Sequence, residues 1–109
     1  MYRGFGGGNM QNLMAQAQKM QRQMQEKMEK AEEELTQADI TGASGGGMVE
    51  VVMNGKGIIQ SVKIKPEAVD PDDVEMLEDL TLAAINDARA QVDNLRKEKL
   101  GAMADGGMF

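Results

Sequence analysis

The sequence predicts an α+β fold in which a long N-terminal helix, a three-stranded antiparallel sheet and a C-terminal helix follow one another. Two β-rich runs flank Asn54-Gly55, the dipeptide most typical of a tight β-hairpin. Apolar residues recur at helical spacing on both sides of this central hairpin. We therefore expect one α-β-β-β-α domain over residues 9–100, between flexible tails at residues 1–8 and 101–109.

The first helix is expected to begin after Asn9, a suitable N-cap. Its apolar stripe advances in steps of three and four residues: Met10, Leu13, Ala17, Met20, Met24, Met28, Ala31, Leu35 and Ala38. A helix of about 29 residues is about 43 Å long at 1.5 Å per residue. A compact domain of this size has a radius of gyration near 13 Å. Part of the helix must therefore project from the domain or meet another subunit.

The stripe itself is rich in methionine, and it allows two interpretations. Packing in a core or a coiled coil is the simpler one. The alternative is a surface that grips another protein, because methionine side chains are flexible and adapt to different partners.

The first strand is expected at Asp39–Ser44, pairing antiparallel with Met48–Met53 across Gly45-Gly46-Gly47. The three glycines resemble a phosphate-binding loop only superficially. They lack the Lys-Ser/Thr that follows in such loops, and they join two strands instead of leading into a helix.

A type I′ turn at Asn54-Gly55 would place Met53 opposite Lys56 and Val51 opposite Ile58. Cross-strand partners share a face of the sheet. The expected buried face, which Gln60 interrupts, consists of Val49, Val51, Met53, Ile58, Val62 and Ile64. The opposite face is mixed and suits cover by another element or subunit; it consists of Met48, Glu50, Val52, Ile59, Ser61 and Lys63.

The second helix is expected to start after Pro66 has ended the third strand. Asp70 is the predicted N-cap, Pro71 occupies the first helical position, and Asp73 has the spacing of a capping-box acid. The apolar stripe of this helix is Val74, Leu77, Leu80, Ala84, Ala88, Val92 and Leu95. Gly101 follows its expected end.

Composition excludes several functions. The chain has no cysteine and no histidine, which removes disulfides, thiol chemistry and metal sites built from imidazole or thiolate. No serine or threonine has an evident base partner, so we expect neither an enzyme nor a small-molecule substrate or cofactor. No apolar run reaches the roughly 20 residues of a membrane span, and no secretory signal is visible. We expect a cytoplasmic protein that does not contact membranes.

The net charge is −6, but charges of each sign gather in different segments. Residues 1–28 sum to +3, residues 29–50 sum to −5, and residues 66–88 hold eight acids and no base. Residues 89–109 return to +1. Such segregation permits a local basic surface on an acidic protein.

Three segments carry a resemblance to a known family: NLMAQAQKMQRQMQEKMEKAEEEL in the first helix, GGGMVEVVMNGKGIIQSVKI in the sheet, and LEDLTLAAINDA in the second helix. Over residues 9–100 the chain resembles the YbaB/EbfC family of bacterial nucleoid-associated proteins. The resemblance implies a tweezer-like homodimer whose helical arms project from a joined β platform. It also implies DNA binding without catalysis, in the nucleoid.

The candidate DNA-binding residues are the bases at the start of the first helix and at the end of the second: Lys19, Arg22, Lys27, Arg89, Arg96, Lys97 and Lys99. Lys and Arg at these positions would contact phosphates of duplex DNA. The sequence shows no groove-reading motif and no aromatic residue in either stripe, so we expect weak sequence selectivity. The bases of the second helix also suit its dipole, which is a purely structural role. The chain could also be a dimeric adaptor that holds a protein.

Overall fold

The computed structural model describes the backbone of residues 2–108 and the side chains of residues 9–101. The elements in chain order are α1 (Tyr2–Gln37), β1 (Ile40–Ser44), β2 (Val49–Met53), β3 (Ile59–Ile64), a short 3-10 helix (Pro66–Ala68) and α2 (Val74–Met108). The predicted fold class is thereby confirmed. The molecule is elongated, with principal extents of 87 × 22 × 16 Å.

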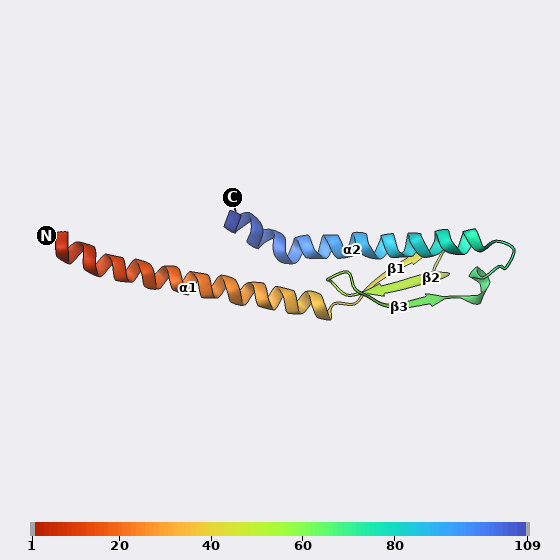
Figure 1. Cartoon of the computed structure of the whole chain (residues 1–109), viewed down its shortest axis with the longest axis horizontal. Helices are drawn as coiled ribbons and strands as arrows, with labels where there is room; N and C mark the ends of the chain where they lie inside the picture. The colour runs from red at the N-terminus through yellow and green to blue at the C-terminus, as the bar shows by residue number, and fades with distance from the viewer. Residues whose placement is uncertain (1, 109) are drawn as a thin grey trace.

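The strand order is β1-β2-β3, and α2 lies across one face of this antiparallel sheet, mainly over β1 and β2 (Figure 1). β1 and β2 pair from Ile40 opposite Met53 to Ser44 opposite Val49. This pairing agrees with the predicted first hairpin. The core is formed by alternate residues of β2 and by residues one turn apart on α2: Val49, Val51, Met53, Ala84, Ala88 and Val92.

Small residues let α2 approach β1 closely. A Cβ added to Gly42 would lie 2.3 Å from the Ala84 carbonyl oxygen and 2.4 Å from the Ala88 backbone nitrogen. Only glycine fits at this point, and alanines face it from the helix. Two hydrogen bonds flank the contact: Ala43 N–H donates to Asp87 Oδ2 at 2.9 Å, and Gln91 Nε2 donates to the Thr41 carbonyl at 2.9 Å.

The register predicted for the second hairpin is wrong. Val51 pairs with Val62, four residues beyond the predicted partner Ile58, and Val49 pairs with Ile64. The ladder is irregular at Val52/Met53. The connection is a longer loop, residues 54–58, instead of a two-residue type I′ turn. Because the shift is an even number of residues, Val62 and Ile64 still share a face with Val49 and Val51, as predicted. Ile58 was predicted on the same buried face, but it lies in the loop and is 61% exposed.

Asn54 organises this loop. It is 5% exposed, and its Oδ1 accepts hydrogen bonds from Lys56 N–H at 2.8 Å and Ile58 N–H at 3.1 Å. The positive φ falls on Gly57, at 82°, and not on the Asn54-Gly55 pair that a type I′ turn would use. Gly55 instead donates its N–H to the Leu35 carbonyl at 2.6 Å, near the end of α1.

The starts of both helices differ from prediction. α1 begins at Tyr2, so Asn9 is not its N-cap, and α2 begins at Val74. The predicted end of the second helix before Gly101 is also wrong, because α2 continues to Met108. Asp73, not Asp70, caps α2, because its Oδ1 accepts the Met76 N–H at 3.1 Å. Asp70 instead closes the preceding turn, where its Oδ1 accepts the Asp72 N–H. The flexibility of the terminal segments stays a prediction, and side chains 1–8 and 102–109 lie outside the described residues.

α1 projects far beyond the sheet, as its length predicts (Figure 1). Among residues 9–37, only the last turns of α1 meet other described residues, where Ala31 is 6% exposed and Leu35 is 1% exposed. All side chains from residue 9 to residue 30 are exposed. We call residues 9–28 the outer arm and residues 31–37 the anchored end.

Candidate nucleic-acid interface

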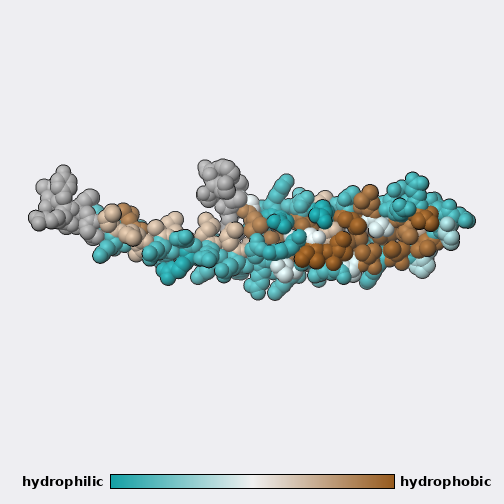
Figure 2. Space-filling view, in the orientation of Figure 1, coloured by the Kyte–Doolittle hydropathy of each residue, from teal (hydrophilic) through white to brown (hydrophobic). Residues whose placement is uncertain are grey.

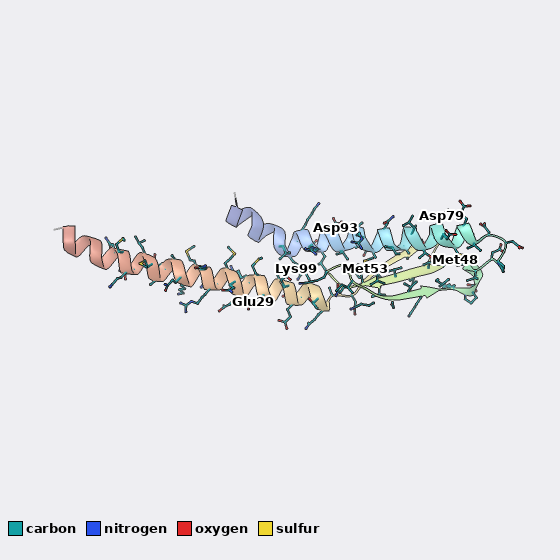
Figure 3. The ribbon with its side chains drawn as sticks, viewed as in Figure 1. Glu29, Met48, Met53, Asp79, Asp93 and Lys99 are labelled. Atoms are coloured by element: carbon teal, nitrogen blue, oxygen red, sulfur yellow. The ribbon has the colours of Figure 1, made fainter. Side chains whose placement is uncertain are left out.

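Two ion pairs hold the anchored end of α1, and these are the ion pairs formed among residues 9–101. Glu32 pairs with Lys56 of the β2–β3 loop. Glu34 Oε2 accepts a hydrogen bond from Lys99 Nζ of α2 at 2.7 Å. Figure 3 shows Lys99 between the two helices. The acids of α1 therefore face basic side chains of its own chain.

These contacts shift the pKa of both carboxyl groups in the same direction. The hydrogen bond and charge of Lys56 lower the pKa of Glu32, and the charge of Arg96 adds a smaller effect. The hydrogen bond and charge of Lys99 lower the pKa of Glu34, with a smaller contribution from Lys30. Both carboxylates are solvent-accessible, so water and salt weaken these pairs.

The three predicted bases of α1, Lys19, Arg22 and Lys27, all lie on the outer arm with exposed side chains. Lys19 and Lys27 are eight residues apart, which is about 12 Å along a helix. Lys19 lies about 22 Å beyond Glu34 by the same rise per residue. The predicted bases of α1 are therefore spread along the arm and do not cluster with those of α2.

Two of the four predicted bases of α2 lie near the anchored end of α1: Lys99 pairs with Glu34, and the charge of Arg96 acts on Glu32. Arg89, Arg96 and Lys97 are exposed, whereas Lys99 is partly covered by its pairing with Glu34. Arg89 reaches over the β2–β3 loop, with a guanidinium nitrogen 3.7 Å from where a Cβ on Gly57 would lie. The α2 bases thus extend from the β2–β3 loop at Arg89 to the anchored end of α1 at Lys99.

Two bases near this surface were not among those predicted from the sequence. Lys30 lines a shallow hollow on α1 together with Gln23, Glu26 and Lys27. Its spacing of three residues from Lys27 is a signal that the sequence does contain. Lys56 lies in the β2–β3 loop, and only the tertiary structure brings it to α1.

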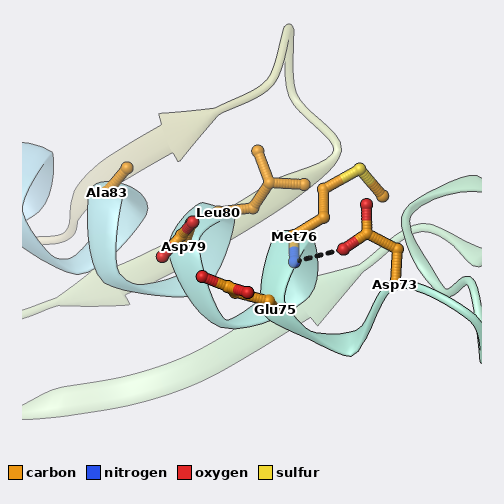
Figure 4. A pocket seen from close by; sticks show the side chains of 6 residues that line it. All are labelled: Asp73, Glu75, Met76, Asp79, Leu80 and Ala83. Atoms are coloured by element: carbon orange, nitrogen blue, oxygen red, sulfur yellow. Dashed lines mark hydrogen bonds between the residues drawn. The ribbon is translucent and has the colours of Figure 1, made fainter.

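The other end of α2 is acidic. Asp73, Glu75 and Asp79 surround Met76 and Leu80 at the helix start, and Asp73 caps the backbone there (Figure 4). Phosphates would be repelled at this end. A polyanion is therefore favoured at the opposite end of α2 and on the outer arm.

An uncovered apolar surface lies between α2 and β3. We call it the α2–β3 groove; it is lined by Ile64, Leu77, Glu78, Thr81, Leu82 and Ile85. Val62 is 46% exposed, Ile64 42% and Leu82 58%, because α2 covers β1 and β2 in preference to β3. Figure 2 shows hydrophobic side chains gathered over the sheet and α2, in contrast to the more polar arm.

Acidic side chains are numerous, yet among the described residues no three of them are arranged to hold a metal ion. Within that same part of the chain, neither helix has a stretch both long and apolar enough to cross a membrane.

Comparison with known proteins agrees with this geometry. Residues 6–108 match the model of the YbaB/EbfC DNA-binding family. A nucleoid-associated protein of Ruminiclostridium cellulolyticum is 48% identical over 97% of this chain and 92% of its own. A nucleoid-associated protein of Chloroflexus aurantiacus is 48% identical over 93% of this chain and 99% of its own. The crystal structure of an uncharacterized Helicobacter pylori protein superposes with a TM-score of 0.71 at 28% identity, covering 82% of this chain and 94% of that one.

Proposed function

Because the chain belongs to the YbaB/EbfC DNA-binding family, we propose that it binds duplex DNA as a homodimer, through phosphate contacts from the bases of α1 and α2. The family is one of nucleoid-associated proteins without enzymatic activity. The observation that carries the proposal is the charge distribution: exposed bases follow the outer arm and the end of α2, while acids occupy the start of α2. Such a protein would help to organise the nucleoid and to regulate genes.

The homodimer is supported by the α2–β3 groove. Its exposed apolar side chains lie beside β3, which is an edge strand of the sheet. Exposed edge strands and contiguous apolar surfaces are typical of protein–protein contacts. A second copy seated here would join two sheets and leave both outer arms projecting, which is the tweezer-like shape that the family resemblance implies.

Weak sequence selectivity follows from the kind of contacts available. The seven proposed bases are Lys and Arg on helix surfaces, and all but Lys99 are exposed, which suits contact with phosphate oxygens. No described aromatic side chain is present to stack on bases, since all three aromatics of the chain fall within residues 1–8 and 102–109. Binding should therefore respond strongly to salt and little to sequence.

A salt titration of binding to duplex DNA tests the proposal. If about four to six phosphate contacts form, log K should fall against log salt with a slope of about −4 to −5, at −0.9 per contact. Failure to bind duplex DNA even at low salt would overturn the proposal and favour the protein-adaptor alternative.

Charge reversal locates the surface. Replacing Arg22→Glu and Lys97→Glu together should weaken binding to all sequences alike and flatten the salt slope. The control is Lys65→Glu, an exposed base beyond the end of β3, which should change binding much less than Arg22→Glu alone. Sedimentation must show that all of these variants stay folded and dimeric. Wild-type binding by the first variant would exclude this surface.

A further inference from the structure

The outer arm carries an apolar stripe that the rest of the chain leaves uncovered. Its large members are between 42% and 68% exposed: Met10, Leu13, Met14, Met20, Met24 and Met28. The same stripe continues into the anchored end, where Ala31 and Leu35 are buried. An apolar helix face of the kind that is usually buried is thus exposed from residue 10 to residue 28, a length of about 27 Å. Figure 3 shows methionine sulfurs along the edge of α1 that faces α2.

The flanks of this stripe are nearly neutral. At 3.6 residues per turn, the side chains beside it are mostly amides: Gln16, Gln21, Gln23 and Gln25. Lys27 adds a single charge at the inner end of one flank. Lys19, Arg22 and Glu26 lie on the opposite side of the helix by the same periodicity. Nearly neutral flanks offer little attraction to a strongly charged partner, and they do not repel a copy of themselves.

The central part of the stripe, from Leu13 to Met24, has a self-complementary spacing. From Leu13 through Ala17 and Met20 to Met24 the steps are four, three and four residues, the same in both directions. An antiparallel second copy would place Leu13 against its Met24 and Ala17 against its Met20. An interface between identical chains with two-fold symmetry requires this kind of match.

We propose that the outer arms of two molecules pair antiparallel along this stripe. Such pairing buries Leu13, Met20 and Met24 with the geometry of two amphipathic helices. The contact lies outside the α2–β3 groove and leaves Lys19 and Arg22 facing outward. If subunits also join through their sheets, which rests on the proposed function, arm pairing links dimers into tetramers or longer chains. One assembly could then hold two DNA segments together.

Disulfide trapping tests the register directly, because the chain has no cysteine of its own. A mixture of the Leu13→Cys and Met24→Cys variants should form a mixed disulfide under mild oxidation. Met24→Cys alone should form little, because its two thiols would lie about 16 Å apart along the pair, beyond the roughly 7 Å between Cα atoms that a disulfide spans. Arg22→Cys is the control, because residue 22 lies on the opposite side of the helix. It should form little mixed disulfide with either the Leu13→Cys or the Met24→Cys variant.

Sedimentation of the full chain tests the assembly. The wild type should show a concentration-dependent doubling of mass that Met20→Gln/Met24→Gln lacks. Met20→Leu/Met24→Leu is the matched control and should retain it, because it keeps apolar side chains of similar volume. Both double variants keep the charge of the arm, so the salt slope of DNA binding should not change.

Three results would overturn the pairing. These are a wild type without the mass doubling, a Gln variant that retains it, or self-disulfides of Met24→Cys that form in preference to the mixed disulfide. The last result would indicate parallel arms. Loss of DNA binding with the mixed disulfide intact would count against the proposed function and not against the pairing.

Discussion

The two ends of α1 carry one apolar stripe, yet they have different surroundings. At the anchored end, Leu35 is 1% exposed, its carbonyl accepts the Gly55 N–H, and two ion pairs tie the helix to α2 and to the β2–β3 loop. On the outer arm, Leu13 is 61% exposed. Periodicity therefore determines which side of a helix is apolar, and the position of other elements determines whether that side is buried. Variants at the two ends should differ accordingly.

Truncating one leucine at each end should give very different losses of stability. Leu35→Ala should lower the free energy of unfolding by about 2–5 kcal/mol, because it leaves a cavity among packed side chains. Leu13→Ala should change it by no more than about 0.5 kcal/mol, as is usual for exposed positions. Urea unfolding of both variants at equal protein concentration measures the difference. Equal losses would mean that the outer arm is as buried as the anchored end.

Gly55→Val should also destabilise the fold, for a different reason from the one that a type I′ turn suggests. A Cβ at Gly55 would lie 2.6 Å from the Leu35 carbonyl oxygen and 2.8 Å from the Leu35 Cα. The loop would have to move off the anchored end, at a cost of about 1–3 kcal/mol typical of overpacking.

The control for Gly55→Val is Gly101→Ala, where an added Cβ meets no atom within 4 Å. Alanine in a helix should be neutral or stabilising by up to about 1 kcal/mol. Thermal unfolding compares the two variants. An unchanged melting temperature in Gly55→Val would show that the loop does not rest on α1.

The ion pair between Glu34 and Lys99 should limit DNA binding. Glu34→Gln removes an acid and frees Lys99, so it should strengthen binding and steepen the salt slope by up to about 0.9 per subunit. Glu33→Gln removes the same charge from an exposed position that forms neither of the two ion pairs. It should strengthen binding less and leave the slope unchanged. Identical slopes for both variants would mean that Lys99 does not contact phosphate.

The smallest expected effect is on the pH dependence of stability. The pKa of Glu32 and Glu34 is lowered from the ordinary value of 4.5 by Lys56 and Lys99. Their contribution to stability is therefore complete above pH 4.5 and is lost as the pH falls through the lowered folded-state values. At neutral pH the wild type should be slightly more stable than Glu32→Gln/Glu34→Gln, and this difference in stability should vanish in acid. A stability difference that grows in acid would contradict the role of these two ion pairs.

Much of the fold follows from local patterns. The helical stripes, the alternation in β2 and the pairing of β1 with β2 were all predicted, because each depends on periodicities of 3.6 and 2 residues that the chain displays directly. The same periodicity places Lys19 and Arg22 on the side of the first helix opposite its apolar stripe. Even the wrong hairpin register kept Val62 and Ile64 on the correct face, because the error was an even number of residues.

Local patterns thus specify which elements form and which of their sides are apolar, whereas packing specifies the neighbours of each side. Asn54-Gly55 satisfies a turn rule, but Gly55 serves a contact with Leu35 that no local rule contains. Gly42 is required because α2 passes directly above it. Lys99 is a base in the sequence and half of an ion pair in the fold. These roles depend on residues 20 to 65 positions apart along the chain, and such distances are set by packing and not by periodicity.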